Sequence, residues 1–362
     1  MEQKRLGDIA TYINGYAFKP EDRGSTGLPI IRIQDLTGNA YDLGFYDGKY
    51  PEKIEINDGD VLISWSASLG VYIWNRGKGL LNQHIFKVVF DKCEVNKQYF
   101  VFAVKHKLKE MELKTHGATM KHIVKKDFDN TVIPFPTVEK QADIAYILSK
   151  IESIVEFRQQ ELQQLDDLIK ARFVEMFGDM YLNSKGWPEA KLESMADVVS
   201  GITKGRKTKA EDLTEVPYMA VSNVKDGYID WTTVKTIEAT QQEIEQYRLL
   251  ADDVLMTEGG DPDKVGRGAI IKEPLENCIH QNHIFRVRLD ESMILPEFFA
   301  EYLQHQRSKR YFLGCAKQTT GIASINMTQL RALPVLMPPL SKQEEFVLFK
   351  AQVNKSKLKK LR

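Results

Sequence analysis

Short loops rich in basic, amide and hydroxyl side chains are the parts of this 362-residue sequence that could do chemistry. Arg, Lys, Asn, Gln, Ser and Thr bind base edges, and Lys, Arg and backbone amides bind phosphates. The second half of the chain has three such loops, at residues 204–209, 259–267 and 317–321. The residues in them that we expect to contact a nucleic acid are Lys204, Arg206, Lys207, Lys264, Arg267, Lys317, Gln318, Thr319 and Thr320.

The first half offers a sparser set of candidate contacts: Lys19, Gln34, Trp65, Ser66, Ser68, Thr119 and Lys121. Asn223, in the second half, follows a strand-like run as Gln34 does, so we add it to the set. Trp65 could pack on the sugar–phosphate backbone or wedge at a base step, but a core tryptophan explains it equally well. Two of the loops could also have no contact with a nucleic acid. Residues 204–209 would then be a solvated charge run, and residues 259–267 a plain hairpin. His84 and His283 are interpreted as structural.

Motifs for catalysis are missing. Residues 337–340, Met-Pro-Pro-Leu, lack the Asn or Asp and the aromatic residue of a DNA methyltransferase motif. The acidic residues and lysine within 258–264 resemble a nuclease site in composition, but the first half has Ser64–Ser68 in that place. Cys278–His283 lacks a fourth zinc ligand, and no Walker loop is present. We therefore expect a protein that is not an enzyme and holds no metal or cofactor of its own.

The chain is a duplication. An ordered set of landmarks occurs twice: Leu6–Ala10 and Leu192–Ala196, Asn14-Gly15 and Ser200-Gly201, Gly59–Ser64 and Asp252–Thr257, Asn82–Val88 and Gln281–Val287, Pro134–Pro136 and Met337–Pro339. Self-similarity of this kind indicates a repeated structural module. Strand-like runs and helical spacing within each half predict two mixed α+β domains, at residues 1–136 and 185–338.

A long helix over residues 137–181, within a spacer at 137–184, is expected to separate the domains. Its apolar residues recur every seven positions and call for a partner helix: Ile144, Leu148, Ile151, Val155, Leu162, Leu165, Ile169 and Met176. About 40 residues at 1.5 Å each give roughly 60 Å, more than one ordinary domain covers. The alternative is a core helix of a single large domain.

The segment 339–362 is the expected partner, pairing antiparallel through Val347, Ala351, Leu358 and Leu361. Residues 137–184 hold five Lys or Arg and nine Asp or Glu, a net charge of −4, whereas residues 339–362 hold seven and two, a net charge of +5. Opposite charges of this kind select partner and direction. By the repeat, the segment would continue for roughly twenty more residues.

Composition narrows the class of protein. The net charge is zero, which argues weakly against a free-standing nucleic-acid binder. No run of 18 apolar residues exists, and the three scattered cysteines suit a reducing compartment, so we expect a cytoplasmic protein.

The ordered set of landmarks, occurring twice and leading each time into a helix, resembles the specificity (S) subunit of type I restriction-modification systems. The Pro-rich exits followed by Glu139-Lys140-Gln141 and Ser341-Lys342-Gln343 carry the resemblance best. It implies two target recognition domains, each reading one half of a bipartite, asymmetric sequence in double-stranded DNA. The antiparallel helices would set the spacing and dock two modification (methyltransferase) subunits, joined by restriction (motor-nuclease) subunits. S-adenosylmethionine, ATP and Mg²⁺ would be bound by those partners.

Three other interpretations stay open. The chain could serve a related methyltransferase assembly that lacks a motor subunit, or it could be a duplicated adaptor that does not bind DNA. It could also be an enzyme that acts through Asp261 and Lys264. The adaptor predicts no salt-sensitive binding to DNA.

Overall fold

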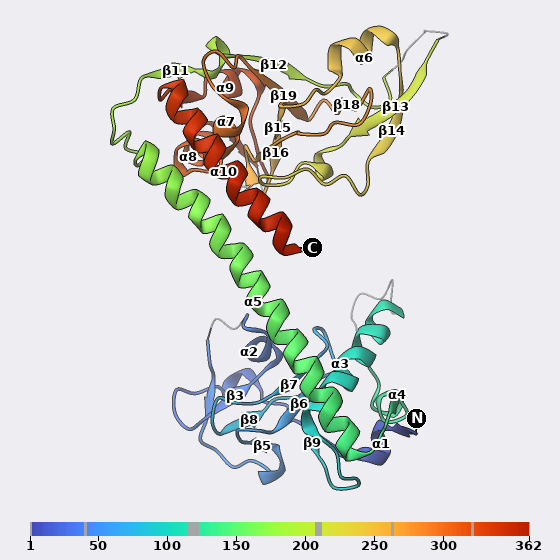
Figure 1. Ribbon diagram of the computed structural model, residues 1–362. Helices are drawn as coiled ribbons and strands as arrows, with labels where there is room; N and C mark the ends of the chain where they lie inside the picture. The colour runs from blue at the N-terminus through green and yellow to red at the C-terminus, as the bar shows by residue number, and fades with distance from the viewer. Residues whose placement is uncertain are drawn as a thin grey trace. The chain divides into compact units, whose positions relative to one another are not determined.

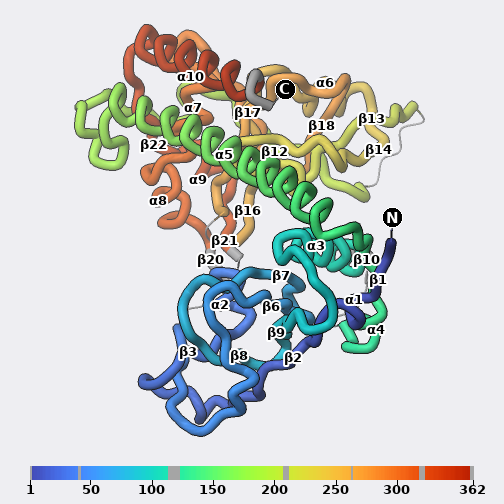
Figure 2. The backbone as a smooth tube through the Cα atoms, turned by 60° about the horizontal axis from the view of Figure 1, so that its bottom comes forward, coloured from blue at the N-terminus to red at the C-terminus, as the bar shows by residue number. Residues whose placement is uncertain are grey.

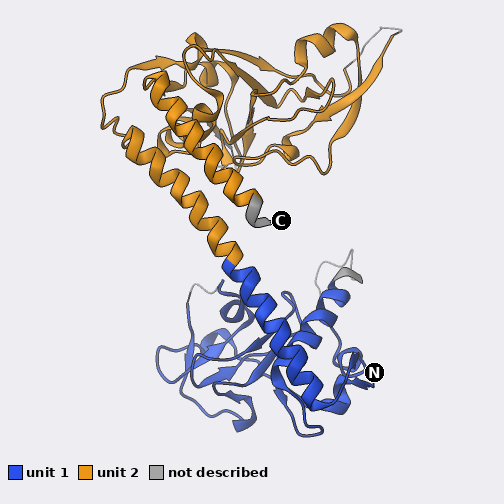
Figure 3. Ribbon diagram, in the orientation of Figure 1, with its two compact units in different colours: residues 1–157 blue, residues 158–362 orange. Residues whose placement is uncertain are grey.

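The computed structural model describes residues 2–39, 42–114, 123–206, 212–261, 264–319 and 322–361. The chain forms two compact units, Met1–Phe157 and Arg158–Arg362 (Figure 3). Each unit combines helices with small β-sheets, so the predicted α+β class with tandem domains is confirmed. None of the helices in the described ranges has the length and hydropathy needed to cross a lipid bilayer.

The main sheet of unit 1 is antiparallel, with the strand order β2-β9-β6-β7. Its strands are β2 (Thr11–Asn14), β9 (Ile85–Val89), β6 (Val61–Ser64) and β7 (Gly70–Ile73). All four residues of β6 are buried, as the apolar run in the sequence predicts. Phe100 of α3 (Lys97–Lys114) and Phe128 of α4 (Lys125–Asp129) share a core with Ile63 and Phe86 of this sheet.

A second sheet of unit 1 has the order β4-β3-β8-β5, and its central strands β3 and β8 are parallel. Its strands are β4 (Phe45–Tyr46), β3 (Leu28–Ile31), β8 (Gly79–Leu81) and β5 (Glu55–Ile56), and α2 (Ile33–Thr37) follows β3. A third pairing joins β1 (Gln3–Arg5), which precedes α1 (Leu6–Ile9), to β10 (Val132–Pro134). This pairing fixes the start of the chain beside its exit from the domain.

Unit 2 repeats these sheets. Its main sheet has the order β12-β19-β15-β17, made of β12 (Ala196–Ser200), β19 (Ile284–Leu289), β15 (Val254–Thr257) and β17 (Gly268–Ile270). The second sheet contains β14 (Lys235–Ala239), β13 (Thr214–Met219) and β18 (Ile279–His280), with β13 and β18 parallel. The entry–exit pair is β11 (Glu189–Lys191) with β22 (Pro334–Leu336). The helices are α6 (Gln241–Tyr247), α7 (Pro296–Tyr302), α8 (Gln306–Cys315) and α9 (Met327–Arg331).

Two equivalent glycines explain one of the repeated landmarks. A Cβ atom on Gly15 would lie 2.0 Å from the carbonyl oxygen of Asn82, and a Cβ atom on Gly201 would lie 2.0 Å from that of His280. No side chain fits at either place, so both positions require glycine. The duplication in the sequence is therefore a duplication of strand order and of close backbone contacts.

Two segments of unit 2 differ from the simplest interpretation of their sequence. Residues 296–312 have the apolar spacing of one helix but form two, because the chain is extended at His305 between α7 and α8. At this break the His305 ring stacks on Phe173 at a centroid distance of 4.2 Å. Residues 316–324 are not a plain loop, because β20 (Lys317–Thr319) and β21 (Ile322–Ser324) pair, and β21 also pairs with β16 (Gly259–Gly260) (Figure 2).

The long helix α5 spans Val138–Phe177. It ends at Gly178, which has a φ of +77°. Lys185 donates hydrogen bonds to the carbonyl groups of Glu175 and Met176, and Trp187 Nε1 donates to that of Phe177, so carbonyls at this helix end are satisfied.

The two ends of α5 differ in burial. Ile169 and Met176 lie in the core of unit 2, whereas Leu162 and Leu165 are half-buried. In unit 1, Ile144 is half-buried. The apolar side chains that stay exposed there are Tyr146, Ile147, Leu148, Ile151, Ile154, Val155 and Phe157.

Helix α10 (Leu340–Leu361) lies beside the C-terminal part of α5 (Figure 1). Glu345 pairs with Arg172 at 2.6 Å, and Lys357 pairs with Asp166, so the expected charge complementarity is present. The predicted register of α10 is wrong. Phe346 and Val353 are buried and Val347 is half-buried, but Ala351 and Leu358 are exposed. The buried row follows the core of unit 2, which α10 covers, rather than α5 alone. The side chain of Leu361 lies outside the described part.

Candidate nucleic-acid interface

The end of β15 opens into a depression of about 580 Å³ in unit 2. Glu258 directly follows β15, and the Gly259-Gly260 strand β16 continues from it. His283, in the turn before β19, and Ser324, in β21, complete the rim. Because both glycines lack side chains, backbone atoms line part of this surface, beside the larger side chains of Glu258 and His283. Such a surface lets a ligand approach the main chain closely.

Three of the predicted contact residues belong to elements around this depression. Lys264 and Arg267 lie in the turn after Asp261, and Lys264 pairs with Asp261. Lys317 is exposed at the start of β20, which the hairpin brings to β16 through β21. The backbones of Gln318 and Thr319 belong to β20, but their side chains and Thr320 lie outside the described part. The structure thus brings the 259–267 and 317–321 loops together.

The two described basic side chains of the 204–209 loop have different surroundings. Lys204 is exposed. Arg206 is half-buried, and its Nε and Nη2 atoms donate to the Glu243 carboxylate at 2.6 and 2.5 Å. The hydrogen bonds from Arg206 are the main cause that lowers the pKa of Glu243 to about 2. Arg206 is thus held by α6, and Lys207 lies outside the described residues.

The Asn223 side chain is a cap and has 0% exposure. Its Oδ1 atom accepts the N–H of Ala220 at 2.9 Å, and its Nδ2 atom donates to the carbonyl of Asp230 at 2.9 Å. In unit 1 the same role belongs to Asp35, which accepts the N–H of Arg32. The proposed groove contact of Asn223 therefore does not fit the structure, because the whole amide is buried and used. Gln34 does not share this position and is exposed.

Some of the predicted contact residues of unit 1 pack inside the unit, and others lie at its surface. Trp65 is half-buried, stacks on Phe86 at 5.5 Å and donates from Nε1 to Asn14 Oδ1 at 3.3 Å. Ser66 is buried, so it is a poor candidate for a contact. Ser68 and Lys19 are exposed. Thr119 and Lys121 lie outside the described residues.

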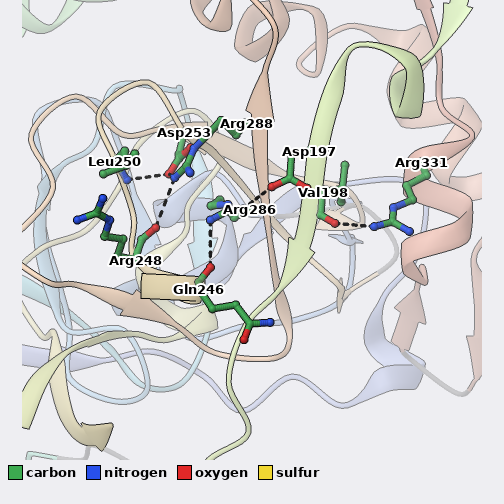
Figure 4. Close-up of polar contacts among 9 residues, drawn as sticks. All are labelled: Asp197, Val198, Gln246, Arg248, Leu250, Asp253, Arg286, Arg288 and Arg331. Atoms are coloured by element: carbon green, nitrogen blue, oxygen red, sulfur yellow. Dashed lines mark hydrogen bonds and ion pairs between the residues drawn. The ribbon is translucent and has the colours of Figure 1, made fainter. Parts of the chain in front are cut away.

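The two arginines of β19 form ion pairs with aspartates of unit 2 (Figure 4). Arg288 donates twice to Asp253, at 2.8 Å from Nε and from Nη2, and Arg286 donates to Asp197 at 2.5 Å. Asp253 is buried and also accepts the N–H of Leu250. These arginines hold the main sheet together and have no place among the candidate contacts.

Comparison with known proteins gives the family. The sequence matches the type I restriction modification DNA specificity domain over residues 1–167 and again over residues 184–360. The chain belongs to this family. The EcoBI specificity subunit of Escherichia coli is 22% identical over 370 residues, which cover 94% of this chain and 77% of the relative. The MjaVIII specificity subunit of Methanocaldococcus jannaschii is 24% identical over 85% of this chain and 76% of its own.

The fold agrees with this assignment. The crystal structure of the type I S subunit from M. genitalium is similar, with a TM-score of 0.53 at 14% identity over 99% of this chain and 90% of that one. A structure of type I restriction-modification complex assembly has a TM-score of 0.54 at 15% identity. The resemblance to type I specificity subunits is confirmed.

The pairing of Glu258 with His283 was not predicted from the sequence. His283 Nδ1 lies 2.5 Å from Glu258 Oε2 at the depression. The repeat carries a signal for this pair, because Glu258 and His283 occupy the positions of Trp65 and His84.

The described residues contain no group of three His, Cys, Asp or Glu arranged to hold a metal ion. Cys278 and His280 are buried, and burial lowers the pKa of His280 to about 4.

Proposed function

We propose that each unit of this specificity subunit reads one half of a bipartite, asymmetric sequence in double-stranded DNA. The observation that carries the proposal is the repeat of one strand order, β2-β9-β6-β7 in the first unit and β12-β19-β15-β17 in the second, with a single long helix between them in the sequence. Two copies of one module suit two similar tasks. Their exposed loops differ in sequence, so the two half-sites differ as well.

Exposed basic side chains of unit 2 favour DNA as the ligand. Lys317 and Lys204 lie at the surface, with Gln318 and Thr319 next to Lys317 in the sequence. Lysines neutralise phosphates, while amide and hydroxyl groups read base edges. In unit 1, Lys19, Gln34 and Ser68 are the corresponding exposed candidates.

Helix α5 would set the distance between the half-sites and dock two modification subunits. In support, its N-terminal part carries exposed apolar side chains, among them Ile151 at 51% and Phe157 at 65%. Exposed apolar side chains grouped on one segment mark a surface that binds another protein. Restriction subunits would then join through this complex.

The chain itself would do no chemistry. The best candidate for a catalytic lysine, Lys264, pairs with Asp261. S-adenosylmethionine, ATP and Mg²⁺ would belong to the modification and restriction subunits. The chain would act inside the cell, where its DNA target lies.

The test is co-expression with the modification subunit encoded nearby, followed by genome-wide mapping of methylated bases. A single motif of two dissimilar blocks around a fixed gap is expected. Methylation without any fixed gap would contradict the spacing role of α5. A chain that binds neither the modification subunit nor DNA at low salt would be an adaptor instead.

A further inference from the structure

We propose that Glu258 and His283 are the base-discriminating element of unit 2, with the Glu258 carboxylate accepting a hydrogen bond from the exocyclic amino group of a cytosine or an adenine. This inference rests on the proposed function, since it requires that unit 2 reads a half-site. It assigns the reading to a pair of residues that the basic loops surround.

The backbone holds Glu258 on both sides. Its N–H donates to the carbonyl of His283 at 3.0 Å, and its own carbonyl accepts the N–H of Ile325 at 2.8 Å. The side chain is held as well, because His283 Nδ1 contacts Oε2 at 2.5 Å. Within the described ranges, the carboxylate has no other hydrogen bond. One carboxylate oxygen is therefore fixed, and the other is left to accept from a ligand.

The pair is accessible at the place where a base edge could reach it. The side chains are 34% exposed for Glu258 and 56% exposed for His283. Both line the depression of about 580 Å³, together with Val221, Gly259, Gly260 and Ser324. A Cβ atom on Gly259 would lie 3.1 Å from the carbonyl oxygen of Ala323, so a side chain at this position would be crowded. With glycine there, no side chain covers the backbone at this part of the depression.

The chemistry of a carboxylate selects the ligand. Glu and Asp accept hydrogen bonds from cytosine N4, and adenine N6 offers a similar amino group in the major groove. A phosphate would be repelled by the carboxylate, so phosphate binding is left to the lysines nearby. The neighbouring carboxylate of Asp261 is already paired with Lys264, which leaves Glu258 as the acceptor.

Unit 1 has the same backbone frame with different chemistry. The N–H of Trp65 donates to the carbonyl of His84 at 3.2 Å, and the carbonyl of Trp65 accepts the N–H of Ile123 at 3.0 Å. The indole meets the His84 ring edge to face at 4.9 Å. The Glu258 carboxylate accepts hydrogen bonds, whereas the Trp65 indole has no acceptor and its N–H already donates to Asn14 Oδ1 at 3.3 Å. The two units therefore cannot offer the same contact to a base at this position.

The experiment uses the chain assembled with its modification subunit. Binding is measured on a panel of duplexes in which each base pair of the mapped target is replaced in turn. Glu258→Gln keeps the shape of the side chain and replaces one acceptor with a donor. We expect discrimination to fall about tenfold or more at one C or A position of the second half-site, with the first half-site unchanged. His283→Ala should reduce discrimination at the same position, and His283→Gln, whose amide can still donate to Glu258, should reduce it less.

Base analogues identify the amino group. Replacing the cytosine with uracil, or the adenine with hypoxanthine, puts a carbonyl oxygen where the amino group was. The wild-type complex should bind the matching analogue about tenfold more weakly than the natural base. Glu258→Gln should show little further loss with the analogue, because either change alone removes the same hydrogen bond. Glu276→Gln, an exposed glutamate of the same unit, is the matched control and should leave the whole profile unchanged.

The outcomes separate the two proposals. If the wild-type complex recognises a bipartite target and Glu258→Gln keeps full discrimination at every position, the base-reading role is wrong and the proposed function stands. If Glu258→Gln weakens both half-sites equally, the base-reading role is also wrong, because a reader in unit 2 affects only its own half-site. If the wild-type complex recognises no bipartite target, both proposals fall.

Discussion

Gln141 and Gln343 make the same pair of hydrogen bonds in the two units. Gln141 Nε2 donates to the carbonyl of Pro136 at 2.8 Å, and its Oε1 accepts the N–H of Asn96 at 3.0 Å. Gln343 Nε2 donates to the carbonyl of Pro338 at 2.8 Å, and its Oε1 accepts the N–H of Leu295 at 2.9 Å. Each glutamine therefore joins the first turn of a helix to the residue just before an earlier helix of the same unit. That residue precedes α3 in unit 1 and α7 in unit 2. Both side chains have 0% exposure, so these bonds form away from water.

Replacing Gln343 with alanine should lower the free energy of unfolding of unit 2 by about 2 kcal/mol or more, because it leaves a buried N–H and a buried carbonyl without partners. Denaturant titration of the full chain, followed by a signal from unit 2, measures the change. Gln352→Ala is the control, since Gln352 is exposed on the same helix. Equal midpoints for the two variants would show that the buried glutamine does not hold the start of α10.

Lys204→Ala and Arg206→Ala should have different effects although the two residues share a loop. Lys204 is exposed, and its replacement should reduce the slope of log affinity against log salt by about one, because one phosphate of the DNA is no longer neutralised. Arg206 is held by Glu243, so its replacement should mainly lower stability, by about 1–2 kcal/mol. Binding to the mapped duplex at several salt concentrations, with denaturation of each variant alongside, tests both. A salt slope that changes with Arg206→Ala and stays constant with Lys204→Ala would reverse these assignments.

The Arg206–Glu243 pair should also make stability depend on pH. The hydrogen bond from Arg206 lowers the pKa of Glu243 from 4.5 to about 2 in the folded chain. A lowered pKa means that the carboxylate stabilises the fold fully above about pH 4.5 and loses this contribution as the pH falls towards 2. The difference in denaturation midpoint between wild type and Glu243→Gln should therefore be larger at pH 7 than at pH 3. Glu276→Gln should show no such dependence, and an equal difference at both pH values would mean that the ion pair does not stabilise the unit.

The sequence predicted the repeated modules well, because the landmarks are positions where the backbone allows few residues. A Cβ atom added to Gly15 or to Gly201 would lie 2.0 Å from a carbonyl oxygen, so no other residue fits there. Helix α5 was also predicted to within a few residues, since a long stretch without Gly or Pro ends at Gly178. Patterns set by local sterics can thus be read without a structure.

Local sequence does not show which polar group is already paired, so it cannot show which surface residues are available to a ligand. Asn223 has the right chemistry for a base contact, yet both ends of its amide serve the backbone around it. The register of α10 failed for a related reason. Phe346 and Val353 pack on the core of unit 2, and a seven-residue repeat alone does not reveal that second partner.

Charging the exposed apolar part of α5 should weaken binding of the modification subunit without unfolding unit 1. Ile151 is 51% exposed, so Ile151→Lys removes little buried surface within the chain. It places a charge on the proposed docking surface, and we expect at least a tenfold loss of affinity if that position is buried in the complex. Size-exclusion chromatography and titration with the purified subunit measure the loss. Gln159→Lys, at another exposed site of the same helix, is the control, and equal affinity of both variants would place the docking surface elsewhere.

Inserting one heptad between Phe157 and Arg158 should change the spacing of the target and leave both half-sites as they are. The insertion falls in α5 at the boundary between the two units, so it breaks neither core. Seven helical residues add about 10.5 Å, which corresponds to roughly three base pairs at 3.4 Å each. Mapping the methylated motif of the variant should therefore return the same two blocks around a longer gap. Because seven residues return a helix close to its original rotation, the docking face of α5 keeps its direction and methylation should persist. If the motif keeps its original gap, the helix does not set the spacing. If the blocks themselves change, the insertion has altered the recognition domains.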